Sequence, residues 1–427
     1  RELTQGVDRS MEQGRNPQAA RDHNRSLMLR LVRDRGPISR AELARASLLS
    51  KPAVTDIVDG LIQHELVRET VKGDVAVGRK PILLEINREA MWAIGIDLSR
   101  DHVDLLITDL MGSVCRFMSR RISFDDEDEG YPERVAKCVT DVIRDSGVPA
   151  SRIAGIGVGY PMPLSHVRRM IVCDGQMVGW KTVQLKQLIE REFGVPVYLD
   201  NDANVAALHE RWHGVADSFR DYLFILVGNG VGMGVVLGGA VYRGASGMAG
   251  EIGHMSIDPD GPQCLCGSRG CLETLVSVPR LLSEVAQAGA VAELGTSSVQ
   301  PVSPTLDDVV GRAFAGDPTV ASAIGEMTNR LAVAVTNLVN TFDPEAVVIG
   351  GPVARLGDRF MIPFREAMAA RAHPLFADKT RLVLSRYSQD AVARGAAMLV
   401  VEDFFESPQR YVPGLSGTQV NGRSQLS

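Results

Sequence analysis

The chain has 427 residues, of which 45% are hydrophobic and 23% charged, a composition typical of a soluble globular protein with two or three domains. Its net charge of −6 is unevenly distributed, because residues 1–90 carry +3 and the remaining residues carry −9. This asymmetry suggests a basic N-terminal module that binds a polyanion, attached to an acidic body.

Two features argue against secretion and membrane insertion. Residues 1–35 are polar and charged, unlike a signal peptide. The uncharged segment 222–242 has nearly the length of a membrane span, but its glycines favour two short strands joined by a turn. We therefore expect a cytoplasmic protein without a membrane domain, whose scattered thiols (Cys115, Cys138 and Cys173) are reduced.

Residues 18–88 predict a small domain that begins with three short helices. The first runs from about Asn24 to Arg35. Ser39 and Glu42 have the spacing of a capping box, which opens a second helix. Ser50 predicts the N-cap of a third helix, whose apolar residues recur at the spacing of one buried face.

A hairpin with a basic loop follows these helices. Residues 66–71 and 82–86 predict its strands, and the whole arrangement is the layout of a winged helix-turn-helix. The third helix would enter the major groove of double-stranded DNA, and the loop would contact phosphates or the minor groove. The alternative is a helical module for dimerisation or protein docking. The residues expected to contact DNA are Arg40, Ser50, Lys51, Pro52, Ala53, Thr55, Lys72, Arg79 and Lys80.

The rest of the chain alternates strands and helices, as α/β domains do. Residues 91–200 predict a first lobe, which is completed by a closing strand and helix at about 385–405. Residues 201–384 predict a second lobe, and the polar residues 407–427 predict a flexible tail.

Three thiols and one imidazole lie within 18 residues, at His254, Cys264, Cys266 and Cys271. This is the ligand set of a closed structural zinc site. A disulfide and unliganded reduced thiols are the alternatives, but a Cys264–Cys266 bridge would be badly strained. We therefore predict bound Zn²⁺ with a structural role.

With these motifs the chain resembles the ROK family, whose name joins repressors, open reading frames and sugar kinases. The resemblance covers about residues 20–405 and is most specific at the cysteine-rich motif. It implies a two-lobed, actin-like sugar-kinase body of the RNase H-like class, with a sugar bound between the lobes. Family members with an added winged helix, such as the N-acetylglucosamine and xylose repressors, are transcription regulators.

The resemblance also implies which residues bind the sugar. Asn201-Asp-Ala-Asn204 matches the family's sugar-binding signature, and Asp202 falls on the position of the kinase base. Glu251 and His254 match a second segment, in which the imidazole would use one nitrogen on zinc and the other on the sugar. The expected sugar ligands are Asn201, Asp202, Glu251, His254, Glu273, Gly159 and Pro161.

The nucleotide segments depart from the family's kinase pattern. The first phosphate segment has lost both glycines and reads Asp97-Leu-Ser-Arg-Asp101. The second lacks its threonine, reading Gly228-Asn-Gly-Val-Gly-Met-Gly234, and the adenosine segment ends in Pro352. Because phosphoryl transfer depends on positioning and on neutralising the phosphates, we expect no kinase activity.

The sequence therefore predicts a sugar-responsive transcriptional regulator, most simply a repressor. As a homodimer or homotetramer it would read a pseudo-palindromic operator with two winged helices. Two alternatives stay open: a sugar kinase with an appended DNA-binding head, and a regulator controlled by a protein partner.

Overall fold

The computed structural model describes residues 17–71, 82–99, 101–123, 130–161, 170–173, 176–293, 304–371, 379–387 and 389–415. The chain divides into two compact units. We call Arg1–Trp92, Asp109–Ser113 and Val401–Ser427 the head, and Ala93–Thr108 with Val114–Val400 the body. Among the described residues, no helix combines the length and the apolar character needed to cross a bilayer.

The head is the winged helix-turn-helix that the sequence predicts. Its three-stranded sheet has the order β1-β3-β2, and β2 pairs antiparallel with β3 so that Val67 lies opposite Ile86. The loop between β2 and β3, with Lys72, Arg79 and Lys80, lies outside the described residues. The head's N-terminal elements are α1 (Pro17–Arg35), β1 (Ile38–Ser39), α2 (Arg40–Ser47), α3 (Lys51–Gln63), β2 (Val67–Val71) and β3 (Ile82–Ile86).

Local side-chain hydrogen bonds define where the head's helices begin. The Ser39 and Glu42 capping box is present at the start of α2, and the Ser50 hydroxyl accepts the Ala53 N–H in the first turn of α3, as predicted. Helix α1 begins at Pro17, earlier than the predicted start near Asn24. Asp22 accepts hydrogen bonds from side chains one turn before and one turn after it, which supports the additional turns.

The last turn of α12 (Ala391–Glu406) belongs to the head, whereas the sequence placed the whole closing helix in the body. Phe404 and Phe405 are fully buried there. The chain continues as the short 3-10 helix η6 (Pro408–Arg410) to the buried Leu415, so residues 407–415 are structured, in contrast to the predicted tail. Burial of large apolar side chains explains both differences, since each aromatic ring stabilises the fold by about 2 kcal/mol.

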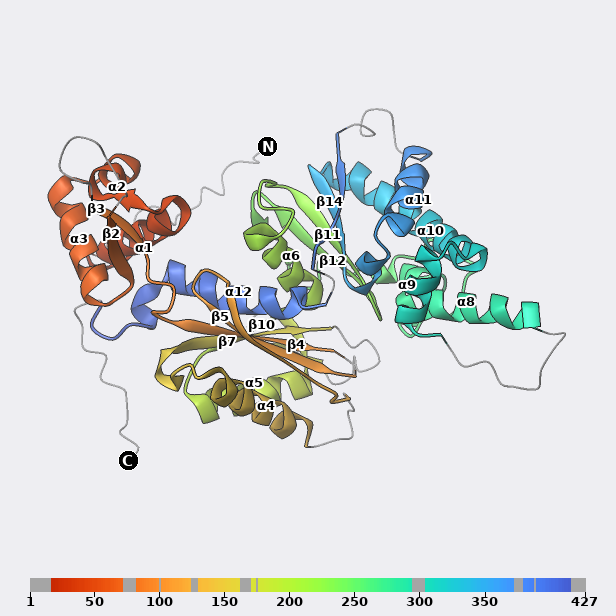
Figure 1. Ribbon diagram of the computed structural model, residues 1–427, viewed down its shortest axis with the longest axis horizontal. Helices are drawn as coiled ribbons and strands as arrows, with labels where there is room; N and C mark the ends of the chain where they lie inside the picture. Colours follow the sequence, from red (N-terminus) through yellow and green to blue (C-terminus); the bar gives the residue numbers. More distant parts are fainter. Residues whose placement is uncertain are drawn as a thin grey trace, which may run out of the picture. The chain divides into compact units, whose positions relative to one another are not determined.

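The first sheet of the body has the strand order β10-β7-β4-β5-β6. Helices α4 and α5 cover one face and α12 covers the other (Figure 1). The helix α12 approaches unusually closely, because a Cβ atom added to Gly95 or Gly157 would lie 1.8 Å from an α12 carbonyl oxygen. The elements are β4 (Trp92–Leu98), β5 (Val103–Asp109), β6 (Val114–Arg120), α4 (Tyr131–Ser146), η2 (Ala150–Arg152), β7 (Ile153–Tyr160), the hairpin β8 (Met170–Cys173) and β9 (Gln176–Gly179), α5 (Trp180–Phe193) and β10 (Val197–Asn201).

The second sheet has the order β13-β12-β11-β14-β15 and is also covered on both faces. In β11, Tyr222 and Phe224 pack against α6, while Leu223 and Ile225 pack on the side of α10 and α11, as expected from the alternation of a strand. The elements are α6 (Asp202–His213), β11 (Tyr222–Val227), β12 (Val231–Leu237), β13 (Ala240–Val241), η4 (Ile252–His254), α7 (Leu272–Val276), α8 (Val278–Glu293), α9 (Leu306–Phe314), α10 (Pro318–Phe342), β14 (Ala346–Gly350), η5 (Pro352–Leu356), α11 (Asp358–Ala369) and β15 (Arg381–Leu384).

Candidate functional site

The junction between β10 and α6 carries the first group of predicted sugar ligands. Asn201 is the N-cap of α6, and its Oδ1 accepts the Ala203 N–H at 2.9 Å. Asp202 follows in the first turn and accepts the same N–H at 2.8 Å. The parallel pairing of β7 with β10 sets Gly159 opposite Asp200 and Tyr160 opposite Asn201, so these segments end side by side.

Gly159 has a packing role that the sequence did not reveal. A Cβ atom at this position would lie 2.6 Å from a methyl carbon of Val392 and 2.8 Å from one of Val205. The glycine therefore permits close contact between β7, α6 and α12. Pro161 follows β7 directly and is half-buried.

The second group of predicted ligands lies in the loop after β13 and at the start of α7. Glu251 is the residue before η4, and His254 ends this short helix. Glu273 lies in the first turn of α7, where its Oε2 accepts the Val231 N–H at 3.1 Å. A backbone hydrogen bond of 2.9 Å from Leu272 to Met255 joins the two segments.

The carboxyl groups of this region act on one another electrostatically. Burial, together with repulsion from the neighbouring Asp202 and Glu273, raises the pKa of Glu251 to about 7. Burial also raises the pKa of Asp202 to about 6, against the hydrogen bonds at the start of α6 that lower it. The carboxyl groups of both segments are therefore close neighbours, and together they offer several acceptors for hydroxyl groups.

The four predicted metal ligands converge to one point. Their ligand atoms all lie within 4.8 Å of one another. The Cys264 sulfur lies 3.6 Å from Nδ1 of His254, and the Cys266 and Cys271 sulfurs lie 3.6 Å apart. Tetrahedral Zn²⁺ with Zn–S bonds of about 2.3 Å would place its sulfurs about 3.8 Å apart, so the donor set and its spacing fit this ion.

The backbone of the cysteine loop brings these donors together. Ser256 and Cys271 form an antiparallel bridge, and the Cys264 N–H donates to the Ser268 carbonyl at 2.8 Å. Gly270 has φ +61°, and a Cβ atom there would lie 1.5 Å from the Asp258 carbonyl oxygen. A bound metal would therefore also restrain Glu251 and Glu273, which flank its ligands in the sequence.

Three residues near the site were not among the predicted ligands. Asp200 is 2% exposed and lies 2.7 Å from the guanidinium of Arg243, which follows β13. The second carboxylate oxygen of Asp200 accepts hydrogen bonds from the Asn201 N–H and the Asn204 side chain. Asp97, at the end of β4, is buried, which raises its pKa to about 8, with Asp202 and Asp104 contributing repulsion.

Replacing Asp97 with asparagine is expected to stabilise the protein increasingly as the pH rises. The pKa of Asp97 is raised from 3.8 to about 8, so the folded protein keeps a proton that the unfolded chain releases. The proton on Asp97 therefore contributes stability that is fully present below about pH 4 and is lost as the pH rises toward 8. The stability difference between Asp97→Asn and the parent should grow by up to about 1.4 kcal/mol per pH unit over this range. Urea unfolding at pH 5 and pH 8 measures it, and an equal difference at both values would contradict the prediction.

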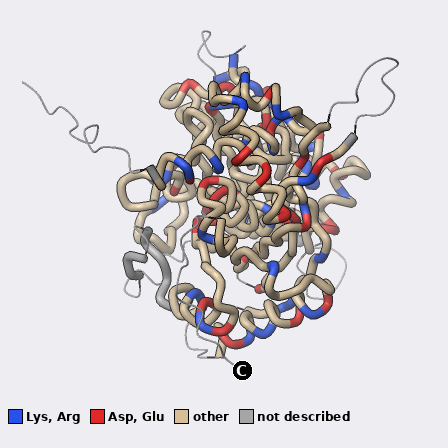
Figure 2. The backbone as a smooth tube through the Cα atoms, turned by 90° about the vertical axis from the view of Figure 1, so that its left-hand side faces the viewer, with Lys and Arg blue, Asp and Glu red and all other residues tan. Residues whose placement is uncertain are grey.

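The start of α3 presents the predicted DNA-contacting residues to solvent. Ser50, Lys51, Pro52 and Thr55 are exposed, and Ala53 is half-buried. On the side of the chain that faces the viewer in Figure 2, lysine and arginine are interspersed with acidic residues.

Arg40 is held within the head by two acidic side chains. Its guanidinium lies 2.9 Å from Asp59 on α3 and 2.7 Å from Glu69 on β2. These ion pairs compete with the phosphate contact that the sequence suggested, and they connect α2, α3 and β2. The role of Arg40 in orienting α3 was not apparent from the sequence, because its partners are 19 and 29 residues away.

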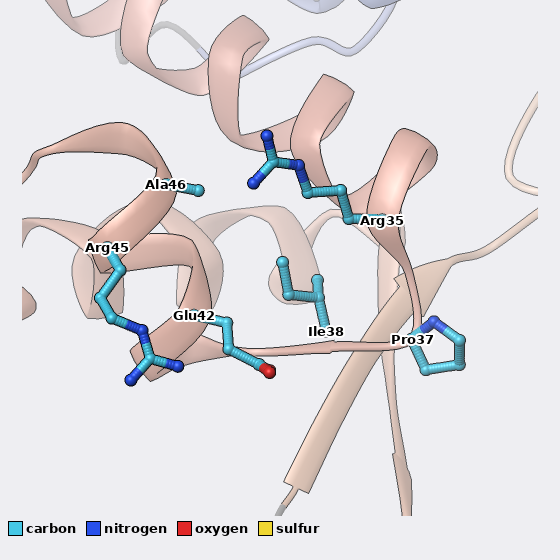
Figure 3. Close-up of a pocket in the computed structure, with 6 residues that line it drawn as sticks. All are labelled: Arg35, Pro37, Ile38, Glu42, Arg45 and Ala46. Carbon is cyan, nitrogen blue, oxygen red and sulfur yellow. The ribbon is translucent and has the colours of Figure 1, made fainter.

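A pocket of about 390 Å³ opens in the head beside α2 (Figure 3). The side chains of Arg35, Glu42 and Arg45 contribute its charged lining. Glu42 is already engaged in the capping box of α2, and none of the predicted sugar or metal ligands lines this pocket. The pocket is thus separate from the candidate site of the body.

Two family models match the chain. The ROK family model matches residues 93–403, and the MarR family model matches residues 23–71. A solved structure described as a ROK family transcriptional regulator, homolog of E. coli MLC protein, is similar with a TM-score of 0.76 and 26% identity. The match covers 93% of this chain and 100% of that regulator.

Two relatives represent the two kinds of protein that this chain resembles, repressors and sugar kinases. The xylose repressor of Caldicellulosiruptor bescii is 30% identical over 396 residues, covering 90% of this chain and 97% of the repressor. The glucokinase of Halalkalibacterium halodurans is 31% identical, and the match covers 94% of the glucokinase but only 72% of this chain. Since the ROK model spans nearly the whole body and a full-length repressor matches head and body together, the chain belongs to the ROK family.

Proposed function

We propose that the protein is a sugar-responsive transcriptional repressor. The observation that carries this proposal is that one chain combines a winged helix-turn-helix with a body in which side chains suited to binding sugar hydroxyl groups are clustered. The similarity to a xylose repressor over 90% of the chain supports the same function. A sugar bound in the body would favour one conformation and so change the affinity of the head for its operator.

The sugar is proposed to bind at the carboxylates near the start of α6. Asp202, Glu251 and Glu273 provide charged acceptors for hydroxyl groups, and Asn201 adds an amide. The Nδ1 atom of His254 faces Cys264, which leaves Nε2 for the sugar. Gly159 and Pro161 would contribute backbone at the end of β7. The names of the relatives make D-xylose and D-glucose the first sugars to examine.

The metal is proposed to be Zn²⁺ with a structural role. Three thiolates and one imidazole form a closed set of four ligands, which leaves no position open for a substrate. Zinc bound there would neutralise the thiolates and hold the loop that carries Glu251 and Glu273. The chain's own carboxylates and His254 would then contact the sugar.

Double-stranded DNA is the proposed partner of the head. Lys51 and its exposed neighbours at the start of α3 would enter the major groove, and Lys72, Arg79 and Lys80 would contact the backbone from the wing. A homodimer or homotetramer would present two heads to a pseudo-palindromic operator.

A sugar kinase is the second candidate, because Asp202 stands at the position of the family's catalytic base and a glucokinase matches most of the body. Two observations favour the repressor. Asp97, Asp101 and Asp104 surround His102 where the kinases have a phosphate segment, so a nucleotide would meet negative charge. Gly228 of the second phosphate segment packs against the Pro352 ring, with 3.3 Å between a Cβ added to the glycine and Cδ of the proline.

The proposal is tested by operator binding with and without sugar. Purified protein is mixed with DNA from upstream of its own and the adjacent genes, at physiological salt, with D-xylose or D-glucose added. We expect one fragment to bind specifically and one sugar to weaken this binding by about 5–150-fold, the range typical of coupled sites. Binding of no fragment would contradict the repressor function, and ATP-dependent phosphorylation of either sugar would favour the kinase.

Lys51→Ala is expected to weaken specific operator binding by about 5–150-fold, as the loss of one good contact in the major groove does. The matched control is Lys379→Ala, which removes an exposed lysine of the body and should leave operator binding unchanged. Titration of both variants by fluorescence anisotropy measures the effect. If Lys51→Ala binds as tightly as Lys379→Ala, the start of α3 does not read the operator.

A further inference from the structure

Helix α12 crosses α6 with almost no space between the two backbones. A Cβ atom at Gly395 would lie 1.7 Å from the Val205 carbonyl oxygen. Val205 is only three residues after Asp202, so the crossing lies in the first turns of α6, next to the proposed sugar ligands. Because packed interiors are nearly incompressible, α6 cannot shift at this point without moving α12.

Beside this crossing, ring contacts lie next to hydrogen bonds between α6 and the segment before α12, such as the one that the Tyr387 hydroxyl donates to the His213 carbonyl oxygen at 3.4 Å. His209 of α6 is 1% exposed, and neither of its ring nitrogens has a hydrogen-bond partner among the described residues. Its ring meets Tyr387 edge-on at 4.4 Å, and the Arg394 guanidinium of α12 lies 5.2 Å from the centre of the same tyrosine ring. Ring contacts of this kind permit small rotations and translations of packed helices more readily than directional hydrogen bonds do.

The other end of α12 is fixed to the first helix of the head. The buried Ser26 hydroxyl of α1 donates a hydrogen bond of 2.8 Å to the Phe405 carbonyl oxygen. This carbonyl belongs to the last turn of α12, whose carbonyl groups have no partner within the helix. The Arg33 guanidinium, also on α1, lies 4.8 Å from the centre of the Phe405 ring.

We propose that α12 transmits the sugar signal from α6 to the DNA-binding head. A sugar that reorients Asn201 and Asp202 would displace the first turn of α6, and the contact between Val205 and Gly395 would pass this displacement to α12. The anchor of Ser26 and Arg33 on Phe405 would then move α1, against which the recognition helix α3 packs. This inference rests on the proposed function, since it specifies how that sugar site is coupled to DNA.

The anchor is tested by the double variant Ser26→Ala, Arg33→Met in the full-length protein. Operator affinity is measured with and without D-xylose and D-glucose, and sugar affinity is measured separately by calorimetry. We expect the double variant to bind the sugar within about twofold of the parent affinity, while the sugar-dependent change in operator affinity falls below about threefold. The matched control is Arg410→Ala, which removes an exposed ion pair with Asp403 and should retain the parent response.

The crossing is tested by Gly395→Ala, whose methyl group must displace α6 from α12. We expect this variant to have an altered operator affinity in the absence of sugar. Should it fail to fold, the anchor variant still decides the question. A parent that responds to sugar, together with a double variant that responds equally, overturns the role of α12. A parent whose operator binding does not respond to either sugar instead overturns the proposed function, and the inference with it.

Discussion

Replacing Cys271 with serine is expected to abolish zinc binding and to weaken sugar binding by more than about tenfold. Cys271 is fully buried, and its sulfur lies 3.6 Å from that of Cys266. The residue also pairs with Ser256 and directly precedes α7, which carries Glu273. Without the metal, the loop with Glu251 would lose its restraint.

Elemental analysis and calorimetric titration with D-xylose and D-glucose measure the two effects. Cys115→Ser is the matched control, because it replaces an exposed thiol on β6 and should retain both the metal and the sugar affinity. Chelation of the parent should reproduce the properties of Cys271→Ser. A variant that retains one equivalent of zinc would show that Cys271 is not a ligand, and one that loses zinc but binds sugar as the parent does would show that the metal does not support the sugar site.

The second large effect is expected from Arg243→Met, which we predict to lower the free energy of unfolding by about 2–4 kcal/mol. Asp200 is 2% exposed, and the guanidinium of Arg243 lies 2.7 Å from its carboxylate. The variant leaves this buried charge without its cation. The expected loss in the free energy of unfolding is smaller than for a fully buried ion pair. The reason is that 37% of the Arg243 side chain is exposed, so that water screens the interaction.

The same variant should weaken sugar binding, because Asp200 positions the Asn201 backbone and the Asn204 side chain. Urea unfolding and calorimetry measure the two effects. Arg144→Met is the control, since it removes an arginine whose ion pairs on α4 lie at the surface and should leave the free energy of unfolding nearly unchanged. Equal stability losses in the two variants would mean that the Asp200 pair is no stronger than a surface pair.

Features set by neighbouring residues could be predicted from the sequence. The Ser39 and Glu42 capping box and the Ser50 cap were identified correctly because both partners lie within three residues. The cysteine-rich loop is equally local, and its four ligand atoms converge as its spacing suggests. Interactions between distant segments could not be predicted in this way. Asp200 and Arg243 are 43 residues apart, and no periodicity relates them.

Helix α12 illustrates the same division. Its position on the first sheet agrees with the closing helix expected for the body, and the glycines of β4 and β7 permit its close approach. That its last turn belongs to the head depends on the contact between Phe405 and Ser26, which are 379 residues apart. Neither residue carries a local signal for this pairing, since serine and phenylalanine occur in many helices without such a contact.

The sequence by itself predicted an α/β body, the winged helix-turn-helix and the group of candidate metal ligands, because hydrophobic periodicity, capping and ligand spacing act over short stretches of chain; the two-lobed fold followed from the resemblance to the ROK family. Only the tertiary structure decided which carboxyl groups share one environment, which cation neutralises Asp200, and where α12 ends. Burial and charge are properties of residues gathered from many segments. The resulting pKa of about 8 for Asp97 and the close contact of Gly395 with Val205 therefore arise only in the folded chain.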